Sequence, residues 1–355
     1  MAIIVNNYLL FHTILKSEAK ASFFCYNFFM LKNGEKLGAF IVPTGIAASI
    51  GGFAGDASCY ARKFSNFSRL IVNPNVVNAG CFSGITENML YVEGYSLDSF
   101  FKKEISLVES KNNNIGIIFD KAIPDDVLNI HINTVNAVKM VYDVNISNHV
   151  VTDEDVGVEF IVNKFGISCG NVKNIETLKK SAEYLLNQGC DAIAICCLFD
   201  DSNDENYAQN GGVDPIGGVE AIISHFISKE FRVPCAHSPA FCDYQILPDI
   251  VDKRASAEYI TPTFLPCILI GLSNAPKISN YSKNNISMDN LDYVVMPYNS
   301  LGSVPVFEAL KNGIKVFAIR ENDTILNISC DNLFKNSGII VLDTYEEALE
   351  QVKKI

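Results

Sequence analysis

An α/β fold with mainly parallel sheets and helices on both faces is predicted by three features of this sequence. Short apolar runs recur without polar alternation, which is typical of strands buried on both faces of a parallel sheet. Segments with a helical period of about 3.6 residues separate these runs. Strand and helix therefore follow each other repeatedly, which indicates right-handed crossover connections. We expect two Rossmann-like halves around a cleft.

The predicted elements are placed by their apolar pattern and by turn residues. Pro124 and the acidic residues after it favour a helix start at 124–141, and Gly189 ends the amphipathic segment 174–188. A third helix is expected at 344–353. The predicted strands are 38–43, 70–73, 115–120, 147–152, 192–197, 232–236, 293–297, 316–320 and 338–342.

Polar stretches near 144–147 and in the Asn- and Ser-rich segment 278–290 divide the chain. The expected parts are an N-terminal extension (1–37), a first α/β half (38–145), a second half (146–277) and C-terminal strand–helix units that complete the sheet (278–355). The extension carries two apolar patches, both shorter than the roughly 18 residues of a membrane span. An additional strand or helix ahead of the main fold is expected there.

The composition limits the partners and the compartment. The 355 residues are 48% hydrophobic and 19% charged, with a formal net charge of −12. An acidic surface repels phosphate backbones and anionic lipids, so we expect neither nucleic acid nor membrane as partner. The 11 cysteines lie mostly in apolar runs and form no CxxC pair, which favours free thiols in the cytoplasm. The sequence leaves open whether the protein forms a homo-oligomer.

A glycine-rich segment, 42–56, follows a predicted buried strand and precedes a predicted helix. Such a loop offers free amides and a helix N-terminus, which suit an anion. Its spacing matches neither the dinucleotide fingerprint nor the phosphate loop. Tight turns and packing are the alternative role. The candidate substrate-binding residues of this segment are Thr44, Gly45, Ser49, Gly51, Gly52 and Asp56.

Asparagines cluster directly after the next predicted strand, at Asn73, Asn75 and Asn78. Ligands of open α/β sheets bind beyond the carboxyl ends of strands, so these amides are candidate substrate contacts. Caps and turns are their alternative role. Glu93 follows shortly and is a candidate acid or base.

The densest polar cluster follows the predicted strands at 192–197 and 232–236. Asp200 comes after the thiols of Cys196 and Cys197, Asp214 opens a glycine-flanked helix, and Cys235 alternates with His237. Three interpretations stay open: the carboxylates and His237 hold a divalent metal, the thiols form an acid–base pair, or the carboxylates and His237 bind a cationic or hydroxyl-rich substrate. Core cysteines and a capping Asp214 are the structural alternative.

The last candidate segment, 296–322, reads as strand, glycine loop, helix, strand and polar tip. It is weakly similar to the nucleotide-side half of two-domain glycosyltransferases, where a comparable loop holds a donor phosphate. The candidate contacts of this segment are Asn299, Gly302, Glu321 and Asn322.

Several long motifs carry a wider resemblance, among them PTGIAASIGGFAGDA, GGVDPIGGVEAIISH and PCAHSPAF. Over about 38–327 the chain resembles an uncharacterised family of bacterial proteins known only as a domain of unknown function, which implies no activity. The run 185–197 and the later segment 231–235 are similar to cofactor-free aspartate/glutamate racemases, which place one cysteine in each half. Leu198 departs from that pattern, and Cys81 follows no comparable strand.

Together these features predict an enzyme that acts on a small polar, carboxylate-bearing metabolite by acid–base chemistry, as racemases, isomerases and lyases do. The candidate catalytic residues are Asp200, Asp214, Cys235, His237 and Glu93, with Cys196 as a substrate contact. This chemistry requires no cofactor, although a divalent metal stays open. The alternatives are a nucleotide- or phosphosugar-dependent transferase and a non-catalytic metabolite-binding protein.

Overall fold

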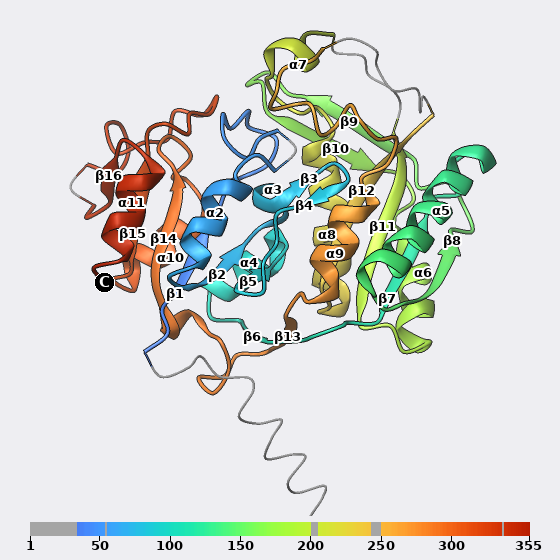
Figure 1. The fold of residues 1–355 in the computed structure, drawn as a ribbon, viewed down its shortest axis with the longest axis horizontal. Helices are drawn as coiled ribbons and strands as arrows, with labels where there is room; N and C mark the ends of the chain where they lie inside the picture. Colours follow the sequence, from blue (N-terminus) through green and yellow to red (C-terminus); the bar gives the residue numbers. More distant parts are fainter. Residues whose placement is uncertain (1–33, 54, 200–204, 243–249, 336) are drawn as a thin grey trace, which may run out of the picture.

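Two parallel sheets stand side by side in the computed structural model, which describes residues 34–53, 55–199, 205–242, 250–335 and 337–355 (Figure 1). The α/β prediction with mainly parallel sheets is confirmed. The six strands of the larger sheet are all parallel and lie in the order β16 (Ile340–Leu342), β15 (Lys315–Ile319), β14 (Leu291–Pro297), β1 (Leu37–Phe40), β2 (Arg69–Val72) and β5 (Met89–Tyr91).

The larger sheet is covered on both faces because its strands are apolar on both faces. Helices α2 (Ser58–Ser65) and α11 (Tyr345–Val352) pack on one side, where Phe40 stacks on Tyr345 with ring centroids 4.9 Å apart. Helices α4 (Gly94–Phe101) and α10 (Val304–Lys311) cover the other side.

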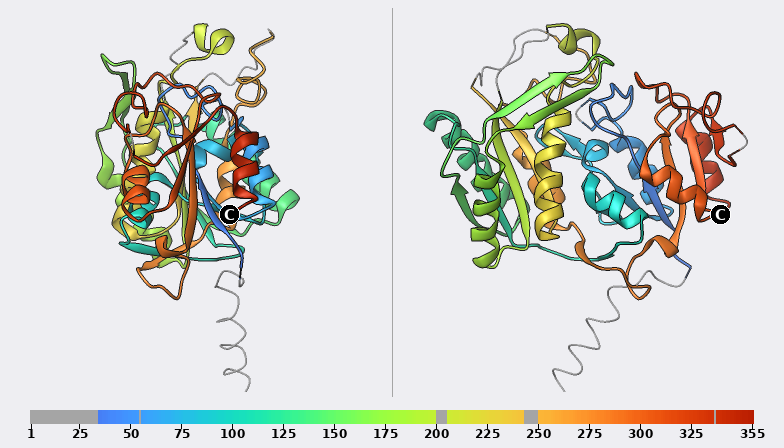
Figure 2. Two further views of the ribbon diagram at one scale, coloured as in Figure 1. Left: turned by 90° about the vertical axis from the view of Figure 1, so that its left-hand side faces the viewer. Right: turned by 180° about the vertical axis from the view of Figure 1, so that it is seen from behind.

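The smaller sheet has four parallel strands in the order β12 (Cys235–Phe241), β11 (Ala192–Phe199), β7 (Ile115–Phe119) and β8 (Ile146–Val151). Helices α5 (Asp125–Tyr142) and α9 (Leu265–Ser273) pack on one face, and α6 (Ile175–Asn187) and α8 (Gly217–Phe231) on the other. Helix α8 also contacts α4 of the larger sheet, and Figure 2 shows the two helices facing each other.

Short antiparallel pairs and turns connect these layers. The ribbon of β6 (Ile105–Val108) and β13 (Lys277–Asn280) lies where the chain passes between the sheets in each direction. The remaining short elements are β3 (Asn78–Ala79) with β4 (Phe82–Ser83), β9 (Val158–Val162) with β10 (Ser168–Val172), α3 (Pro74–Val77), α7 (Glu205–Asn210) and the 3₁₀ turn Met288–Asn290.

Most predicted elements lie where the apolar pattern placed them, and the differences are local. The strand expected at 232–236 is β12, which begins at Cys235 and continues to Phe241. The hairpin of β9 and β10 was not predicted, because it lacks a continuous buried run: four of its ten residues are exposed and only Ser168 is buried. The extension 1–37 is described only from residue 34 onward, so the strand or helix expected there lies outside the described residues.

Sheet membership does not follow the boundary predicted at residue 145. Strand β7 and helix α5 come from the expected first half, 38–145, but β7 pairs with β8 and β11 of the smaller sheet. Strands β14 to β16 extend the sheet of β1, so distant parts of the sequence form the larger sheet. Among the described residues, no helix combines the length and apolar character that crossing a membrane requires.

Candidate functional site

A cavity of about 540 Å³ opens between the two sheets. Its first wall consists of the segments that follow β1, β2, β5 and β14 at the carboxyl edge of the larger sheet. Its second wall consists of β12 and the first turns of α8. Ligands of open parallel sheets bind at such carboxyl edges, so this cavity is the candidate site.

Part of the predicted set meets in this cavity. The segment after β1, the asparagines after β2, the acid after β5 and the cluster on the smaller sheet all contribute side chains or backbone. The predicted residues that line the cavity are Thr44, Gly52, Asn73, Asn75, Asn78, Glu93, Asp214 and His237.

The other predicted residues within the described ranges do not line the cavity. Asp200 lies outside the described residues. Residues from the glycine-rich segment, the buried strands and the 296–322 segment form the rest, and they are Gly45, Ser49, Gly51, Asp56, Cys196, Cys235, Asn299, Gly302, Glu321 and Asn322.

Asn322 and Ser49 join two loops of the larger sheet. The amide of Asn322 donates to the carbonyl of Ile50 at 2.8 Å and to the hydroxyl of Tyr345 at 2.7 Å. The hydroxyl of Ser49 accepts from the amide of Asp323 at 2.9 Å. The oxygen of Asn322 accepts from the amide of Ile50 at 2.9 Å, so both polar groups of this side chain have partners inside the fold.

The remaining residues of the 296–322 segment are engaged in the same way. Asn299 donates to the carbonyl of Thr324 at 2.9 Å and accepts from its hydroxyl at 2.8 Å. Glu321 accepts from the amide of Tyr345 at 2.6 Å, at the start of α11. Gly302 packs against Ile328. The phosphate contacts expected from the glycosyltransferase likeness are therefore not directed at the cavity.

The glycine-rich segment folds around its own carboxylate. The amide of Gly51 donates to the side chain of Asp56, and burial raises the pKa of Asp56 to about 6. The carbonyl of Gly45 accepts from the amide of Ser168 at 3.1 Å. The amide of Gly51 is therefore occupied by an aspartate and is not free for a substrate anion.

The thiols of Cys196 and Cys235 are buried in the smaller sheet. Burial raises the pKa of both thiols well above the ordinary value. A buried thiol without a nearby cation stays protonated and is neither nucleophile nor base. The racemase-like pair of thiolates therefore has no support in this geometry.

The lining asparagines are held by backbone groups. The amide of Asn73 donates to the carbonyl of Val42 at 2.8 Å, and its oxygen accepts from the amide of Val42 at 3.0 Å. Asn75 donates to the carbonyl of Pro43 at 3.2 Å. Asn78 donates to the hydroxyl of Tyr91 at 3.1 Å. These contacts fix the mouth of the larger sheet, and they leave one oxygen on Asn75 with no partner among the described residues.

Glu93 caps helix α4, and Asp214 holds the turn directly ahead of α8. Glu93 accepts from the amides of Tyr95 at 2.8 Å and Ser96 at 2.5 Å, at the start of α4. Asp214 accepts from the amide of Ile216 at 3.0 Å, ahead of α8. Burial raises the pKa of Asp214. Both carboxylates thus orient helix starts and do not stand free as bases.

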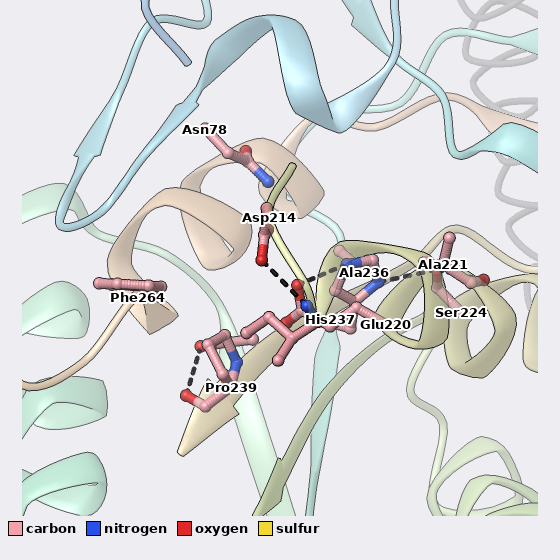
Figure 3. A network of polar contacts seen from close by, with 12 residues as sticks. Asn78, Asp214, Glu220, Ala221, Ser224, Ala236, His237, Pro239 and Phe264 are labelled. Atoms are coloured by element: carbon pink, nitrogen blue, oxygen red, sulfur yellow. Dashed lines mark hydrogen bonds and ion pairs between the residues drawn. The ribbon is translucent and has the colours of Figure 1, made fainter. Parts of the chain in front are cut away.

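Glu220 and His237 form a pair of titratable side chains in the lining of the cavity. The Oε2 atom of Glu220 in α8 lies 3.7 Å from Nε2 of His237 in β12 (Figure 3). On the other side of the ring, Nδ1 lies 2.9 Å from the hydroxyl of Ser224. Burial lowers the pKa of His237 to about 3. Burial and the charges of Asp214 and Glu258 raise the pKa of Glu220 well above its ordinary value.

Several lining residues were not among the predicted site residues. Glu220 and Ser224 lie four positions apart on α8, so they share one helix face, but spacing alone does not show that this face meets a cavity. Further examples come from α4, α8, α7 and the loop ahead of α9, and they are Asp98, His225, Tyr207, Glu258 and Tyr259.

The lining is acidic and lacks strong cations. No lysine or arginine is among the residues that line the cavity in the described structure. Within the described ranges there is also no group of three or more His, Cys, Asp or Glu residues arranged to hold a metal. Direct proton transfer by side chains is the chemistry that this donor set favours.

Comparison with known proteins gives a family without an assigned activity. Residues 38–354 match a family described as "Protein of unknown function (DUF3326)". The chain is 36% identical over 298 residues to an uncharacterised lipoprotein of Synechococcus sp., covering 81% of this chain and 82% of that protein. No solved structure matches. The sequence-based assignment to an uncharacterised family is thus confirmed, whereas the likeness to racemases is not supported.

Proposed function

Since the chain belongs to the DUF3326 family of unknown function, we propose from the geometry of its cleft that it is an enzyme that moves protons on a small polar metabolite, as isomerases and lyases do. The observation that carries this proposal is the approach of Glu220 to His237 at 3.7 Å inside the cavity. A volume of about 540 Å³ suits a small metabolite.

His237 is the base of the proposed pair. Its pKa of about 3 keeps the ring neutral at physiological pH. The hydroxyl of Ser224 donates to the carbonyl of Ala221 at 3.3 Å, so it accepts from Nδ1 of His237. This assignment of the tautomer leaves a lone pair on Nε2, the atom that faces Glu220.

Glu220 is the acid of the pair. Its raised pKa keeps a proton on the carboxyl group, which can be given to the substrate. When Glu220 gives up that proton, its carboxylate stabilises the protonated ring of His237, 3.7 Å away. Ionisation of the acid therefore raises the pKa of His237 and makes it a stronger base. A substrate C–H bond then gives its proton to Nε2 while another substrate atom receives the proton of Glu220. Return of the proton from imidazolium to carboxylate resets the enzyme without a co-reactant.

The substrate group suggested by the sequence is not favoured by this cavity. A carboxylate would meet an acidic lining without lysine or arginine. We therefore retain the acid–base chemistry and the small polar substrate, and we leave the carboxylate out. We also propose the cytoplasm as the compartment, because the ten described cysteines are free thiols. The Synechococcus relative is named a lipoprotein, and cell fractionation decides the location of this protein.

Hydrogen exchange in D₂O tests the proposed reaction. The protein is incubated with single members of a panel of small polar metabolites, and deuterium entering a C–H position is followed by NMR. We expect exchange with at least one metabolite that raises the melting temperature, and its loss in His237→Asn and Glu220→Gln. The matched controls are His149→Asn on the exposed side of β8 and Glu230→Gln at the exposed end of α8. Binding without exchange would make the protein a metabolite-binding module instead.

A further inference from the structure

Acidic side chains outnumber basic side chains in the lining of the cleft. Five acidic side chains line the cavity, and no lysine or arginine does in the described structure. His225 lies 3.6 Å from Glu93, and His237 is neutral. The five acids are Glu93, Asp98, Asp214, Glu220 and Glu258. A solute that enters this space meets a negative potential.

Glu220 is an acidic residue with an incomplete set of hydrogen bonds. The residue is 8% exposed, and its Oε1 atom is buried with no hydrogen-bond partner among the described residues. Glu93 and Asp214, by contrast, accept hydrogen bonds from the amides of Ser96 and Ile216. A buried carboxyl oxygen without a donor is rare in native proteins, and a ligand that donates hydrogen bonds would complete it.

Aromatic rings stand beside these acids. Tyr207 donates from its hydroxyl to Glu258 at 3.4 Å and stacks on Phe53 with ring centroids 5.4 Å apart. Tyr259 lines the same part of the cavity. The guanidinium of Arg254, which lies over the ring of Phe53, is held by Asp252 through two contacts of 3.1 Å and does not line the cavity. Carboxylates combined with aromatic rings are the usual recognition elements for ammonium groups.

We propose that the substrate of this cleft carries an ammonium group, as a primary or methylated amine, bound by Glu220, Glu258, Tyr207 and Tyr259. This inference rests on the proposed function, since it names the substrate class of the same site. An ammonium group donates hydrogen bonds to the oxygen that lacks a partner, and its positive charge complements the acidic lining. A neutral alcohol supplies the hydrogen bond without the charge, and an anion supplies neither.

Binding of a cation is expected to release a proton. Asp214 and Glu258 are the charged groups that act on Glu220, and His237 is its titratable neighbour. The phenol of Tyr91 and the thiols of Cys196 and Cys267 also lie within electrostatic reach, and burial keeps all three protonated. An ammonium group beside Glu220 favours its carboxylate. A simple amine offers no atom that takes the carboxyl proton, so that proton leaves for the solvent, whereas the substrate of the proposed reaction takes it itself.

A matched series of probes tests the substrate class. Butylamine, choline, butanol and butyrate are titrated into the full-length protein by calorimetry in two buffers of different ionisation enthalpy, with melting temperatures measured in parallel. We expect the two amines to bind and raise the melting temperature, and the apparent enthalpy to differ between buffers because a proton is released. Binding of butyrate or butanol as tight as that of the amines would overturn the proposal.

Two variants locate the cation. Glu220→Gln is expected to remove the proton release, and Glu258→Gln to weaken amine binding about tenfold, which corresponds to ~1.4 kcal/mol. Glu230→Gln, on the exposed end of the same helix, is the matched control and should bind as the wild type does. Unchanged proton release in Glu220→Gln, or unchanged affinity in Glu258→Gln, would place the cation elsewhere and contradict the proposal.

The two hypotheses fail separately. If amines bind with proton release but no deuterium exchange occurs, the ammonium-bearing ligand class is supported and the proposed enzyme activity is contradicted. If deuterium exchange occurs on an uncharged or anionic metabolite, the acid–base reaction is supported and the proposal that the substrate carries an ammonium group is contradicted.

Discussion

The backbone amide of Ser168 donates to the carbonyl of Gly45 at 3.1 Å and thereby joins the loop after β1 to strand β10. The hydroxyl of the same serine accepts from the amide of Gly218 at 2.9 Å and donates to the carbonyl of Pro215 at 2.7 Å. One residue therefore fixes both the glycine-rich segment of the larger sheet and the start of α8. Since α8 carries Glu220, this serine also sets where the acid stands.

Removing the hydroxyl of Ser168 is expected to destabilise the protein and to disturb the cleft. Ser168→Ala leaves the amide of Gly218 and the carbonyl of Pro215 without their side-chain partner in a buried setting. An unsatisfied buried group costs about 1–3 kcal/mol, so we expect a loss of about 2 kcal/mol in urea unfolding. Ser147→Ala, at an exposed position of β8, is the control. A loss no greater than that of the control would mean that water replaces the hydroxyl.

Glu220 should make stability fall as the pH rises. In the folded protein its carboxyl group holds its proton above the ordinary pKa of 4.5, whereas the unfolded chain loses that proton near 4.5. Raising the pH above 4.5 therefore favours the unfolded chain until the folded group also ionises. Glu220→Gln keeps the shape and removes this titration.

The expected result is that Glu220→Gln is more stable than the wild type at pH 8 and that the difference shrinks as the pH falls toward 4. Each unit of pKa shift corresponds to about 1.4 kcal/mol. Urea unfolding of both proteins between pH 4 and pH 8 measures the difference, with Glu230→Gln as the exposed control on α8. A difference that does not depend on pH would show that Glu220 is ionised in the folded protein.

The fold could be predicted because buried strands and amphipathic helices have strong local patterns. The apolar run of β11 and the acidic first turn of α5 mark their elements without reference to the rest of the chain. Sheet membership is decided by long-range pairing, and therefore the sequence did not show that β7 pairs with β11. The hairpin of β9 and β10 lacks a continuous buried run and was missed for that reason.

The site was predicted in part because residue type does not reveal what a side chain meets. Asn73 and Asn322 both follow strands of the larger sheet, but only Asn73 lines the cavity. The side chain of Asn322 instead forms hydrogen bonds with Ile50 and Tyr345. The reactivity of a thiol depends on how deeply it is buried, and the positions of cysteines in the sequence do not show that burial. Glu220 was not chosen because its helix face meets the cavity only after α8 packs beside α4.

The buried cysteines provide the sharpest test of the rival thiol mechanism. Cys196 and Cys235 lie in neighbouring strands, do not line the cavity, and have pKa values raised well above the ordinary value by burial. We expect Cys196→Ala and Cys235→Ala to keep the deuterium exchange activity within about twofold, with a stability loss of about 1 kcal/mol for each small cavity. Iodoacetamide should label exposed Cys59 and Cys242 in the native protein and spare both buried thiols. If either variant loses deuterium exchange while its stability is unchanged, a thiol takes part in the reaction, and the mechanism based on Glu220 and His237 is contradicted.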